Sequence, residues 1–404
     1  MRKRVEALVN PALLIWARES AHLSLDIVAK KANIKVEQIK SWESGQSRPT
    51  VTQLIKLGEI YKRPISVFYL PKPPKEFDAL HDYRRLPGQP APELSPALAY
   101  EIRRARERRE IALDLYELLG EKPPEIKLKI SLDDDAEAFS IQIRKFLGID
   151  IKEQIRWKTY YDAYNRWRGA IESSGFLCFQ TADNKIKLTE MRGFSISQMP
   201  LPVIVINKLD FPAPKIFSLM HELSHILLGK EGICEFEEAY RLAPEEQKVE
   251  IFCNHLAGAV LVPKDDLLMQ KTVKRLIKIN SIEDSDIKYL AQRYKVSKEV
   301  ILRRLLHFRY ISHDFYKEHK EIYDKEAIQK ALEEDHKSMN GEKVFFLPMH
   351  IRIISCNGRN LTNLILSGYY QEKITLSEVS DYLGIKLKYL PKIEAEISKH
   401  FSFI

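Results

Sequence analysis

The chain has 404 residues, of which 45% are hydrophobic and 30% charged. This composition excludes a disordered protein, and the length predicts two to four domains because it exceeds what one hydrophobic core usually serves. The apolar runs are shorter than the roughly 18 residues of a membrane helix, and the four cysteines form no C-x-x-C pair. We therefore expect a globular cytoplasmic protein with no membrane partner, no disulfide framework and no thiolate zinc site.

Positive charge is concentrated at the N-terminus. Residues 1–75 contain fourteen Lys and Arg but six Asp and Glu, so their excess equals the net charge of +8 of the whole chain. A small basic unit is typical of a nucleic-acid-binding module, although solvated surface lysines explain the count almost as well.

The first predicted elements are short helices within residues 11–70. Pro11 is placed to begin the first helix, Ser24 to cap the second and Thr50 to cap the fourth, while the third covers residues 35–43. The second and third helices, joined by a tight turn, make a helix-turn-helix whose third helix can enter a major groove.

The segment from Ser24 to Ile65 resembles the XRE-type helix-turn-helix family, including a W-E-x-G sequence at residues 42–45. Asp26 departs from the family, because an anion near the start of the second helix repels DNA. The alternative is a helix-turn-helix that serves protein contacts or dimerisation. The resemblance implies that five residues lie on or beside the surface that faces the DNA groove: Lys35, Glu37, Gln38, Lys40 and Ser41. It also implies that Gln46 and Arg48 lie near DNA phosphates.

Beyond a proline-rich linker, the sequence predicts a long helix over residues 97–119, whose mixed charges indicate a solvated, self-paired face. The period changes after Gly175, where four short runs rich in β-forming residues predict a small sheet just before residue 215. These runs are residues 176–181, 186–190, 192–197 and 202–207. We expect an edge of this sheet to accept an extended peptide as an added strand.

The stretch KIFSLMHELSHILLGK, residues 215–230, carries the predicted chemistry. His221 and His225 stand four residues apart, so a helix places both imidazoles on one face, where they can hold a metal ion. Glu222 points about 100° away from His221 around the helix. We therefore expect Glu222 to act as a general base, which takes a proton from the attacking water and passes it to the leaving amine.

A catalytic zinc usually has three protein ligands, so another element should supply the third. The strongest candidate is Glu250, which shares a helical face with Asn254, and we expect Asn254 to support the ligands by hydrogen bonding. Glu235, Glu245 and Glu246 stay open as rivals for the third position. Two histidines and one carboxylate suit zinc, but they also suit manganese.

The segments MHELSHILLG and EIFCNHLAGAVLVP are similar to the ImmA/IrrE family of metallopeptidases, whose second motif has a Glu four residues before an Asn and closes with Pro. The resemblance implies a compact zincin-like fold and cleavage of specific regulatory proteins. It also implies a zinc-type ion held by His221, His225 and Glu250, with Glu222 as general base.

We therefore expect a mainly α, multidomain chain. Residues 1–75 are predicted to form an all-α XRE-type helix-turn-helix DNA-binding domain, and residues 76–130 a linker and long charged helix. Residues 131–270 are predicted to form an α+β, zincin-like metallopeptidase domain with a small sheet, and residues 271–404 a mostly helical C-terminal domain.

The expected function is that of a metal-dependent, site-specific endopeptidase that acts on a regulatory protein, such as a transcriptional repressor, and is coupled to DNA binding. The alternative is a DNA-binding regulator or antitoxin-like protein whose peptidase fold binds a partner with little hydrolysis. The expected partners are DNA and a protein substrate or cognate regulator. Adjacent genes are a candidate source of that protein, and a homodimer is left open.

Overall fold

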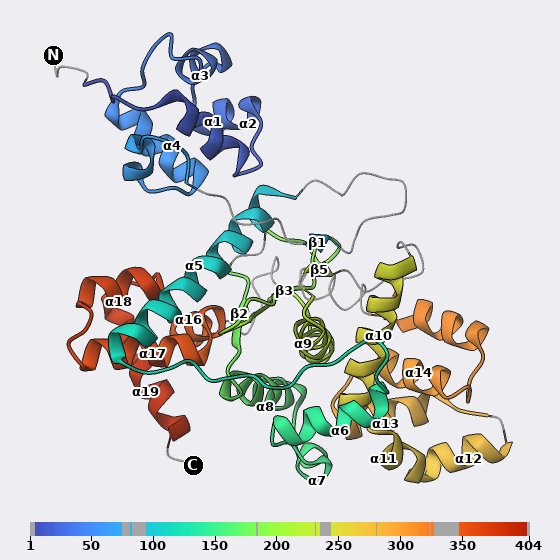
Figure 1. The fold of residues 1–404 in the computed structure, drawn as a ribbon. Coiled ribbons are helices and arrows are strands. Elements are labelled where there is room, and N and C mark those ends of the chain that lie inside the picture. The colour runs from blue at the N-terminus through green and yellow to red at the C-terminus, as the bar shows by residue number, and fades with distance from the viewer. Residues whose placement is uncertain are drawn as a thin grey trace. The chain divides into compact units, whose positions relative to one another are not determined.

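The structure is a computed structural model, which describes residues 5–74, 81–82, 94–182, 185–230, 232–234, 244–279, 281–323, 325–326 and 347–401 (Figure 1). Contacts divide the chain into two compact units, residues 1–79 with 92–106 and residues 80–91 with 107–404. The division falls within helix α5 (Pro96–Leu119). Within the described ranges, no helix is both long enough and apolar enough to cross a membrane.

The first unit is built from short helices whose starts follow local chemistry. Pro11 occupies the first turn of its helix, the Ser24 hydroxyl accepts a hydrogen bond from the Ile27 amide, and Thr50 and Gln53 form a capping box. These three predicted helix starts are therefore confirmed. The elements are α1 (Pro11–Glu19), α2 (Leu25–Ala32), α3 (Val36–Glu43), α4 (Val51–Tyr61) and the 3₁₀ helix η1 (Ile65–Tyr69).

These elements share one apolar core, which includes the buried side chains of Leu14, Trp42, Leu54, Tyr61 and Phe68. Because each helix is too short to be stable alone, burial in this common core is what holds the helices in place.

The described residues of the second unit contain a five-stranded mixed sheet in the order β1-β5-β3-β4-β2. Strand β3 is antiparallel to both β4 and β5, whereas β2 is parallel to β4 and β1 is parallel to β5. Phe194 of β3 is opposite Val205 on one side and Ile233 on the other, so β3 is an internal strand. The strands are β1 (His81–Asp82), β2 (Leu177–Gln180), β3 (Gly193–Ile196), β4 (Val203–Ile206) and β5 (Gly232–Cys234).

Helix α9 (Pro212–Leu227) lies at the centre of this unit (Figure 1). It packs against β3 and β4 of the sheet, against α8 (Tyr160–Ser173) and against α10 (Pro244–Leu261). α10 in turn packs against α6 (Ala136–Phe146). One core of buried apolar side chains runs through α6, α8, α9, α10 and β4, so α9 is enclosed on several sides.

Further helices extend the second unit beyond α10. The helix α14 (Lys298–His307) packs against both α10 and α13 (Asp284–Tyr294). Residues 313–323 are also helical. The helices α11 (Lys264–Met269) and α12 (Lys271–Ile279) lie between α10 and α13 in the chain, while the short α7 (Ile151–Gln154) lies between α6 and α8.

The last group of helices is joined to the sheet by a buried ion pair. Helices α16 and α17 pack against β2, and the Arg168–Glu172 pair on α8 bonds to both of them. The Arg168 guanidinium donates to the Ser355 carbonyl at 2.9 Å, and the Glu172 carboxylate accepts from the Arg359 amide at 3.1 Å. The group comprises α16 (Met349–Asn357), α17 (Arg359–Tyr370), α18 (Leu376–Leu383), the 3₁₀ helix η3 (Leu387–Tyr389) and α19 (Leu390–Phe401).

The predicted fold class, mainly helical with a small sheet, is confirmed. The predicted strand at residues 186–190 is wrong, because this segment forms turns. A side chain, rather than hydrogen bonds to a neighbouring strand, holds the backbone of this segment. The buried Asn207 side-chain amide donates to the carbonyls of Ile186 and Met191 at 3.0 and 2.8 Å. A side-chain amide can thus replace strand pairing where the chain makes tight turns.

The prediction of a solvated face for α5 is wrong for two of its arginines. Arg108 and Arg109 are buried. The Arg109 guanidinium donates to the carbonyls of Gln198, Pro200 and Leu201 at 3.3, 2.8 and 3.2 Å. Five N–H donors allow one arginine to satisfy several loop carbonyls, and charge patterning along a helix does not reveal this role.

Candidate metal centre

Helix α9 places the two motif histidines one turn apart on one face. Phe211 precedes the helix and prolines occupy its first turn, where their missing N–H groups cost nothing. His221 and His225 are both fully buried, and their ring centroids are 4.7 Å apart. Apolar neighbours such as Leu219, Leu223 and Ile226 on the same helix belong to the surrounding core.

Helix α10 brings the Glu250 carboxylate against these imidazoles. The Nε2 atom of His221 is 3.3 Å from Glu250 Oε2, and Nε2 of His225 is 3.1 Å from Glu250 Oε1. The two Nε2 atoms are themselves 3.0 Å apart. All three side chains are buried, with Glu250 2% exposed, so three donor groups meet in an apolar interior.

This donor set fits a zinc-type ion. Zinc binds nitrogen and oxygen at about 2.0–2.2 Å, so neighbouring ligand atoms of a tetrahedral site lie about 3.3 Å apart. The observed separations of 3.0, 3.1 and 3.3 Å are close to that value. Two imidazoles and one carboxylate are also the ligand set that leaves a fourth position of such an ion available for water.

Burial and charge act in opposite directions on these groups. Burial alone would raise the pKa of the Glu250 carboxyl, but the charges and hydrogen bonds of His221 and His225 outweigh it and hold that pKa well below its usual range. Burial lowers the pKa of His221, although Glu250 opposes this change. The site therefore favours the ionised form of Glu250, which is the form that binds metal, while burial works against a proton on His221.

Glu222 is fully buried on the same helix but is not part of this donor cluster. Its carboxylate lies against the start of β3. A Cβ atom added to Gly193 would be 2.9 Å from Glu222 Oε1, so a glycine at this position lets the strand approach the carboxylate. Sequence reasoning missed Gly193, although an isolated glycine in a predicted strand signals close backbone approach.

Two residues of α10 contact the histidines from the side. Asn254 is half-buried and lies one turn beyond Glu250, where its side chain favours the protonated form of His221 and so opposes the lowering of the His221 pKa by burial. Cys253 is buried, and burial raises the pKa of its thiol although His225 opposes this change. The supporting role expected for Asn254 stays a prediction, and sequence reasoning assigned no role to Cys253.

The rival third ligands lie elsewhere. Glu245 and Glu246 are in the first turn of α10, where Glu245 is exposed and Glu246 half-buried. Neither belongs to the donor cluster formed by the described residues. Glu235 lies outside the described residues.

The predicted DNA-contacting residues lie on or next to α3. Lys35 is the residue that precedes this helix, and Asp26 is exposed in the first turn of α2. Ser41 is half-buried, and its hydroxyl is 2.7 Å from the Ser47 hydroxyl, so it is already engaged within the protein. The remaining predicted contacts are all exposed: Glu37, Gln38, Lys40, Gln46 and Arg48.

Two parts of the chain match known protein families. Residues 180–306 match the Peptidase_M78 family model, which describes an IrrE N-terminal-like domain. Residues 14–68 match a family model described as a helix-turn-helix. These matches confirm the two resemblances predicted from the sequence, and the first spans both α9 and α10. A comparison with the curated proteins gives no match.

Proposed function

We propose that the chain is a metal-dependent endopeptidase that cleaves a regulatory protein and binds DNA through its helix-turn-helix domain. The observation that carries the proposal is the convergence of His221, His225 and Glu250 in a buried site beside Glu222. Burying three polar groups in an apolar interior costs free energy, unless a partner that all three can bind compensates for the lost hydration. The match of this region to an IrrE N-terminal-like domain supports the same reading.

In this proposal His221, His225 and Glu250 hold the ion. The ion supplies Lewis acidity, which polarises the scissile carbonyl and lowers the pKa of a water molecule. The ionised state of Glu250 keeps the ligand set charged and ready to bind.

Glu222 moves the protons of the reaction. Its carboxylate takes one proton from the attacking water, while the water oxygen forms a bond to the carbonyl carbon. The same carboxyl group then gives that proton to the amide nitrogen as the C–N bond breaks. Gly193 leaves space for this carboxylate beside β3, which a larger residue would take up.

The substrate does not add to the strand next to Glu222. β3 has hydrogen-bonded neighbours on both sides, so this strand offers no free edge among the described strands. The borders of the sheet are β1 and β2. Recognition by side chains near the metal centre is therefore favoured over strand addition at β3.

The helix-turn-helix match supports a link to DNA, and the exposed polar residues of α3 give that helix a surface suited to a groove. A peptidase attached to a DNA-binding domain has ready access to proteins bound at the same DNA. We therefore propose a transcriptional regulator, such as a repressor, as the substrate class.

The test uses Glu222→Gln and Glu250→Ala in the full-length chain. Candidate substrates are the protein products of adjacent genes, and cleavage is followed by mass spectrometry of the intact products. We expect Glu222→Gln to keep the metal and lose about 10²–10⁴-fold in cleavage rate, since it removes only the base. We expect Glu250→Ala to lose the metal as well. Glu245→Gln is the matched control, because Glu245 is exposed on the same helix and outside the cluster.

Unimpaired cleavage by Glu222→Gln would reject this mechanism. Full metal occupancy in Glu250→Ala would reject the third ligand. Wild-type protein that binds a partner and an operator but cleaves nothing, with both activities unchanged in Glu222→Gln, would instead favour an antitoxin-like regulator.

A further inference from the structure

Helices α18 and α19, with η3 between them, repeat the turn of the matched helix-turn-helix formed by α2 and α3. The first helix has eight residues in both pairs, and it ends at a residue in the left-handed conformation: Asn33 with a φ of 57° and Gly384 with a φ of 64°. The next amide donates to the carbonyl five residues earlier, which is Ile34 to Ala29 at 3.0 Å and Ile385 to Ser380 at 2.9 Å. The same hydrogen bond therefore closes both turns.

The buried positions around the two turns also correspond. Counted from the left-handed residue, the positions at −5, −1, +6 and +9 are buried in both pairs. These residues are Val28, Ala32, Ile39 and Trp42 in the N-terminal pair, and Val379, Leu383, Leu390 and Ile393 in the C-terminal pair. Because the turn and the burial pattern are both shared, the C-terminal segment has the framework of a helix-turn-helix.

A third pair of helices, α13 and α14, has the same turn. Lys295 is left-handed with a φ of 56°, and the Val296 amide donates to the Ala291 carbonyl at 3.0 Å. The second helix of this pair is nevertheless covered, because His307 is the one exposed residue among the ten described residues of α14. The turn by itself therefore does not make a DNA-binding surface.

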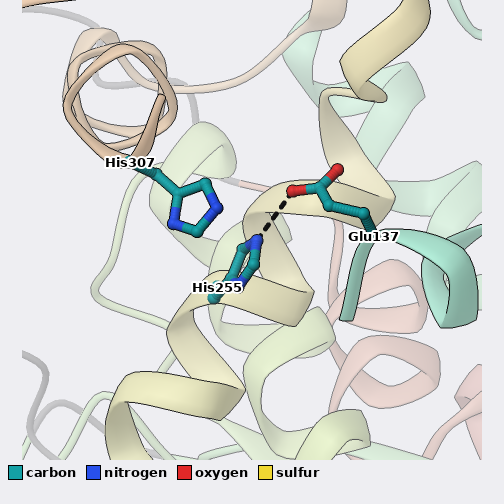
Figure 2. Close-up of side chains that lie close together, drawn as sticks. All are labelled: Glu137, His255 and His307. Atoms are coloured by element: carbon teal, nitrogen blue, oxygen red, sulfur yellow. Dashed lines mark hydrogen bonds and ion pairs between the residues drawn. The ribbon is translucent and has the colours of Figure 1, made fainter. Parts of the chain in front are cut away.

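Contacts with two other helices explain why α14 is covered. His307 lies against His255 of α10, with 3.7 Å between the ring centroids, and His255 Nε2 is 2.7 Å from Oε1 of Glu137 on α6 (Figure 2). Arg304 of α14 donates to both oxygens of the same carboxylate at 2.5 and 2.8 Å. The second helix of this pair therefore has a structural role within the second unit.

The second helix of the C-terminal pair is open to solvent along one side. Exposed residues recur every three or four positions along η3 and α19, which places them on one face: Lys388, Pro391, Lys392, Ala395 and Lys399. Buried residues recur in the same way, and α19 packs against α16 and α17. Unlike α14, this helix therefore offers a face to a ligand.

Lysines occupy the part of this face that corresponds to the DNA-facing positions expected on α3. Aligned on the left-handed residues, Lys35, Glu37, Gln38, Lys40 and Ser41 correspond to Lys386, Lys388, Tyr389, Pro391 and Lys392. The first set has two lysines and one glutamate, a net charge of +1, whereas the second has three lysines and no acid, a net charge of +3. The higher positive charge favours contact with phosphates.

The two acids of α19 are engaged within the protein. The Glu394 carboxylate accepts from the Tyr370 hydroxyl at 2.6 Å, and Glu396 pairs with Lys399 at 3.1 Å. Both acids are half-buried, whereas Lys388 and Lys392 are exposed. The face that α19 presents to solvent is therefore basic.

The start of α18 also differs from that of α2 in a way that favours DNA. The second residue of each helix is exposed, and it is Asp26 in α2 but Ser377 in α18. A hydroxyl can donate to a phosphate, whereas a carboxylate repels it. The next residue, Glu378, accepts from the Thr375 amide at 2.6 Å, and Asp381 lies in the last turn of the helix.

We propose that α18, η3 and α19 form a second DNA-binding element, in which η3 and the start of α19 enter the major groove of a duplex. Lys386, Lys388 and Lys392 pair with phosphates along the groove, and the Ser377 hydroxyl donates to a phosphate beside it. The inference goes beyond the proposed peptidase function and does not depend on it. Its consequence is that DNA binding persists when the N-terminal helix-turn-helix is disabled.

The experiment isolates the second element in the full-length chain. Lys35→Gln/Lys40→Gln removes the two lysines expected on the DNA-facing side of α3, and fluorescence polarisation measures the Kd for a fluorescein-labelled duplex of random sequence. We expect this variant to keep binding that weakens as the salt concentration rises. Adding Lys386→Gln, Lys388→Gln and Lys392→Gln should weaken the remaining binding roughly tenfold. It should also reduce the slope of log Kd against log salt by about 2.7, because each phosphate contact contributes about 0.9.

A matched control changes three other exposed lysines of the second unit. Lys271, Lys274 and Lys278 lie on α12, outside the proposed element, so their replacement by Gln changes the net charge equally but should leave the Kd unchanged. Ser377→Asp is an independent variant that removes no lysine. It should weaken binding several-fold, because it places an anion where α2 has Asp26. Circular dichroism establishes that all variants are folded.

Complete loss of duplex binding in Lys35→Gln/Lys40→Gln would overturn the proposal, because the C-terminal pair would then hold no DNA. Equal losses from the α12 variant and from the triple lysine variant would do so as well, since binding would follow net charge alone. An unchanged Kd in Ser377→Asp would place α18 away from the phosphates and have the same consequence. Displacement of the probe by polyglutamate as readily as by unlabelled duplex would assign this face to an acidic protein instead.

Discussion

The contact between Gly193 and Glu222 gives the most direct prediction from the structure. In Gly193→Ala, the new Cβ atom would lie 2.9 Å from Oε1, 3.1 Å from Cγ and 3.3 Å from Cδ of Glu222. Gly193 is not among the glycines with a positive φ angle, so alanine is not excluded by the backbone. The effect of the substitution should therefore come from displacement of the carboxylate.

The size of the effect follows from these distances. Comfortable contact between heavy atoms begins near 3.5 Å, so the carboxylate must move by roughly 0.5 Å. A misplacement of about 1 Å in a reacting group can cost about 10²-fold in rate. We therefore expect kcat to fall by roughly ten- to hundredfold, with metal content unchanged because the three ligands are not touched. Overpacking should also lower the free energy of unfolding by about 1–3 kcal/mol.

The assay compares kcat, metal content and unfolding free energy for wild type, Gly193→Ala and Gly169→Ala. Gly169 lies in α8, and a Cβ atom there would meet no atom within 4 Å, so this control should keep wild-type activity. Wild-type kcat in folded Gly193→Ala would refute the idea that β3 positions the Glu222 carboxylate. Loss of metal in the same variant would refute the view that the contact acts on the base alone.

Three further predictions concern other parts of the chain. Burial would raise the pKa of Glu137, but hydrogen bonds and charges from Arg304 and His255 lower it from 4.5 to about 2. The ionised carboxylate therefore stabilises the folded state above pH 4.5, and this stabilisation is lost as the pH falls towards 2. In wild type this change in the free energy of unfolding should reach up to about 3 kcal/mol between pH 4.5 and pH 2, and Glu137→Gln should abolish it. Urea unfolding at several pH values measures it, and the same pH dependence in both proteins would contradict the pairing of Glu137 with Arg304 and His255. Asp26→Asn should tighten binding to a DNA duplex several-fold at low salt, because it removes an exposed anion from the first turn of α2, and no change in a mobility-shift assay would place α2 away from the phosphates. Removal of metal by a chelator should lower the Tm, because an ion that binds only the folded chain stabilises it, and an identical Tm for metal-free and metal-loaded protein would argue against a buried site.

Local features of the chain were predictable from the sequence. Pro11, Ser24 and Thr50 mark helix starts because capping depends on residues within one turn. His221 and His225 share a face because a helix of 3.6 residues per turn requires it. The family resemblances rest on such local motifs, and both are confirmed. The roles of the site residues stay predictions that the experiments above test.

Contacts between distant segments were decided by the tertiary structure. Spacing within α10 made Glu250 a candidate, but only the packing of α10 on α9 brings its carboxylate within 3.1–3.3 Å of the imidazoles. Pairing with two neighbours makes β3 an internal strand, so it cannot accept a peptide as an added strand, and hydrogen bonds to loop carbonyls explain why Arg109 is buried.

The sequence by itself therefore indicated several of the helices, three of their starts and a set of candidate metal ligands, because these depend on interactions within a few residues. The structure alone decided which groups meet. Gly193 lies against Glu222, and Glu250 meets His221 and His225, because strands and helices far apart in the chain pack together. Such long-range packing leaves no periodic signal in the sequence.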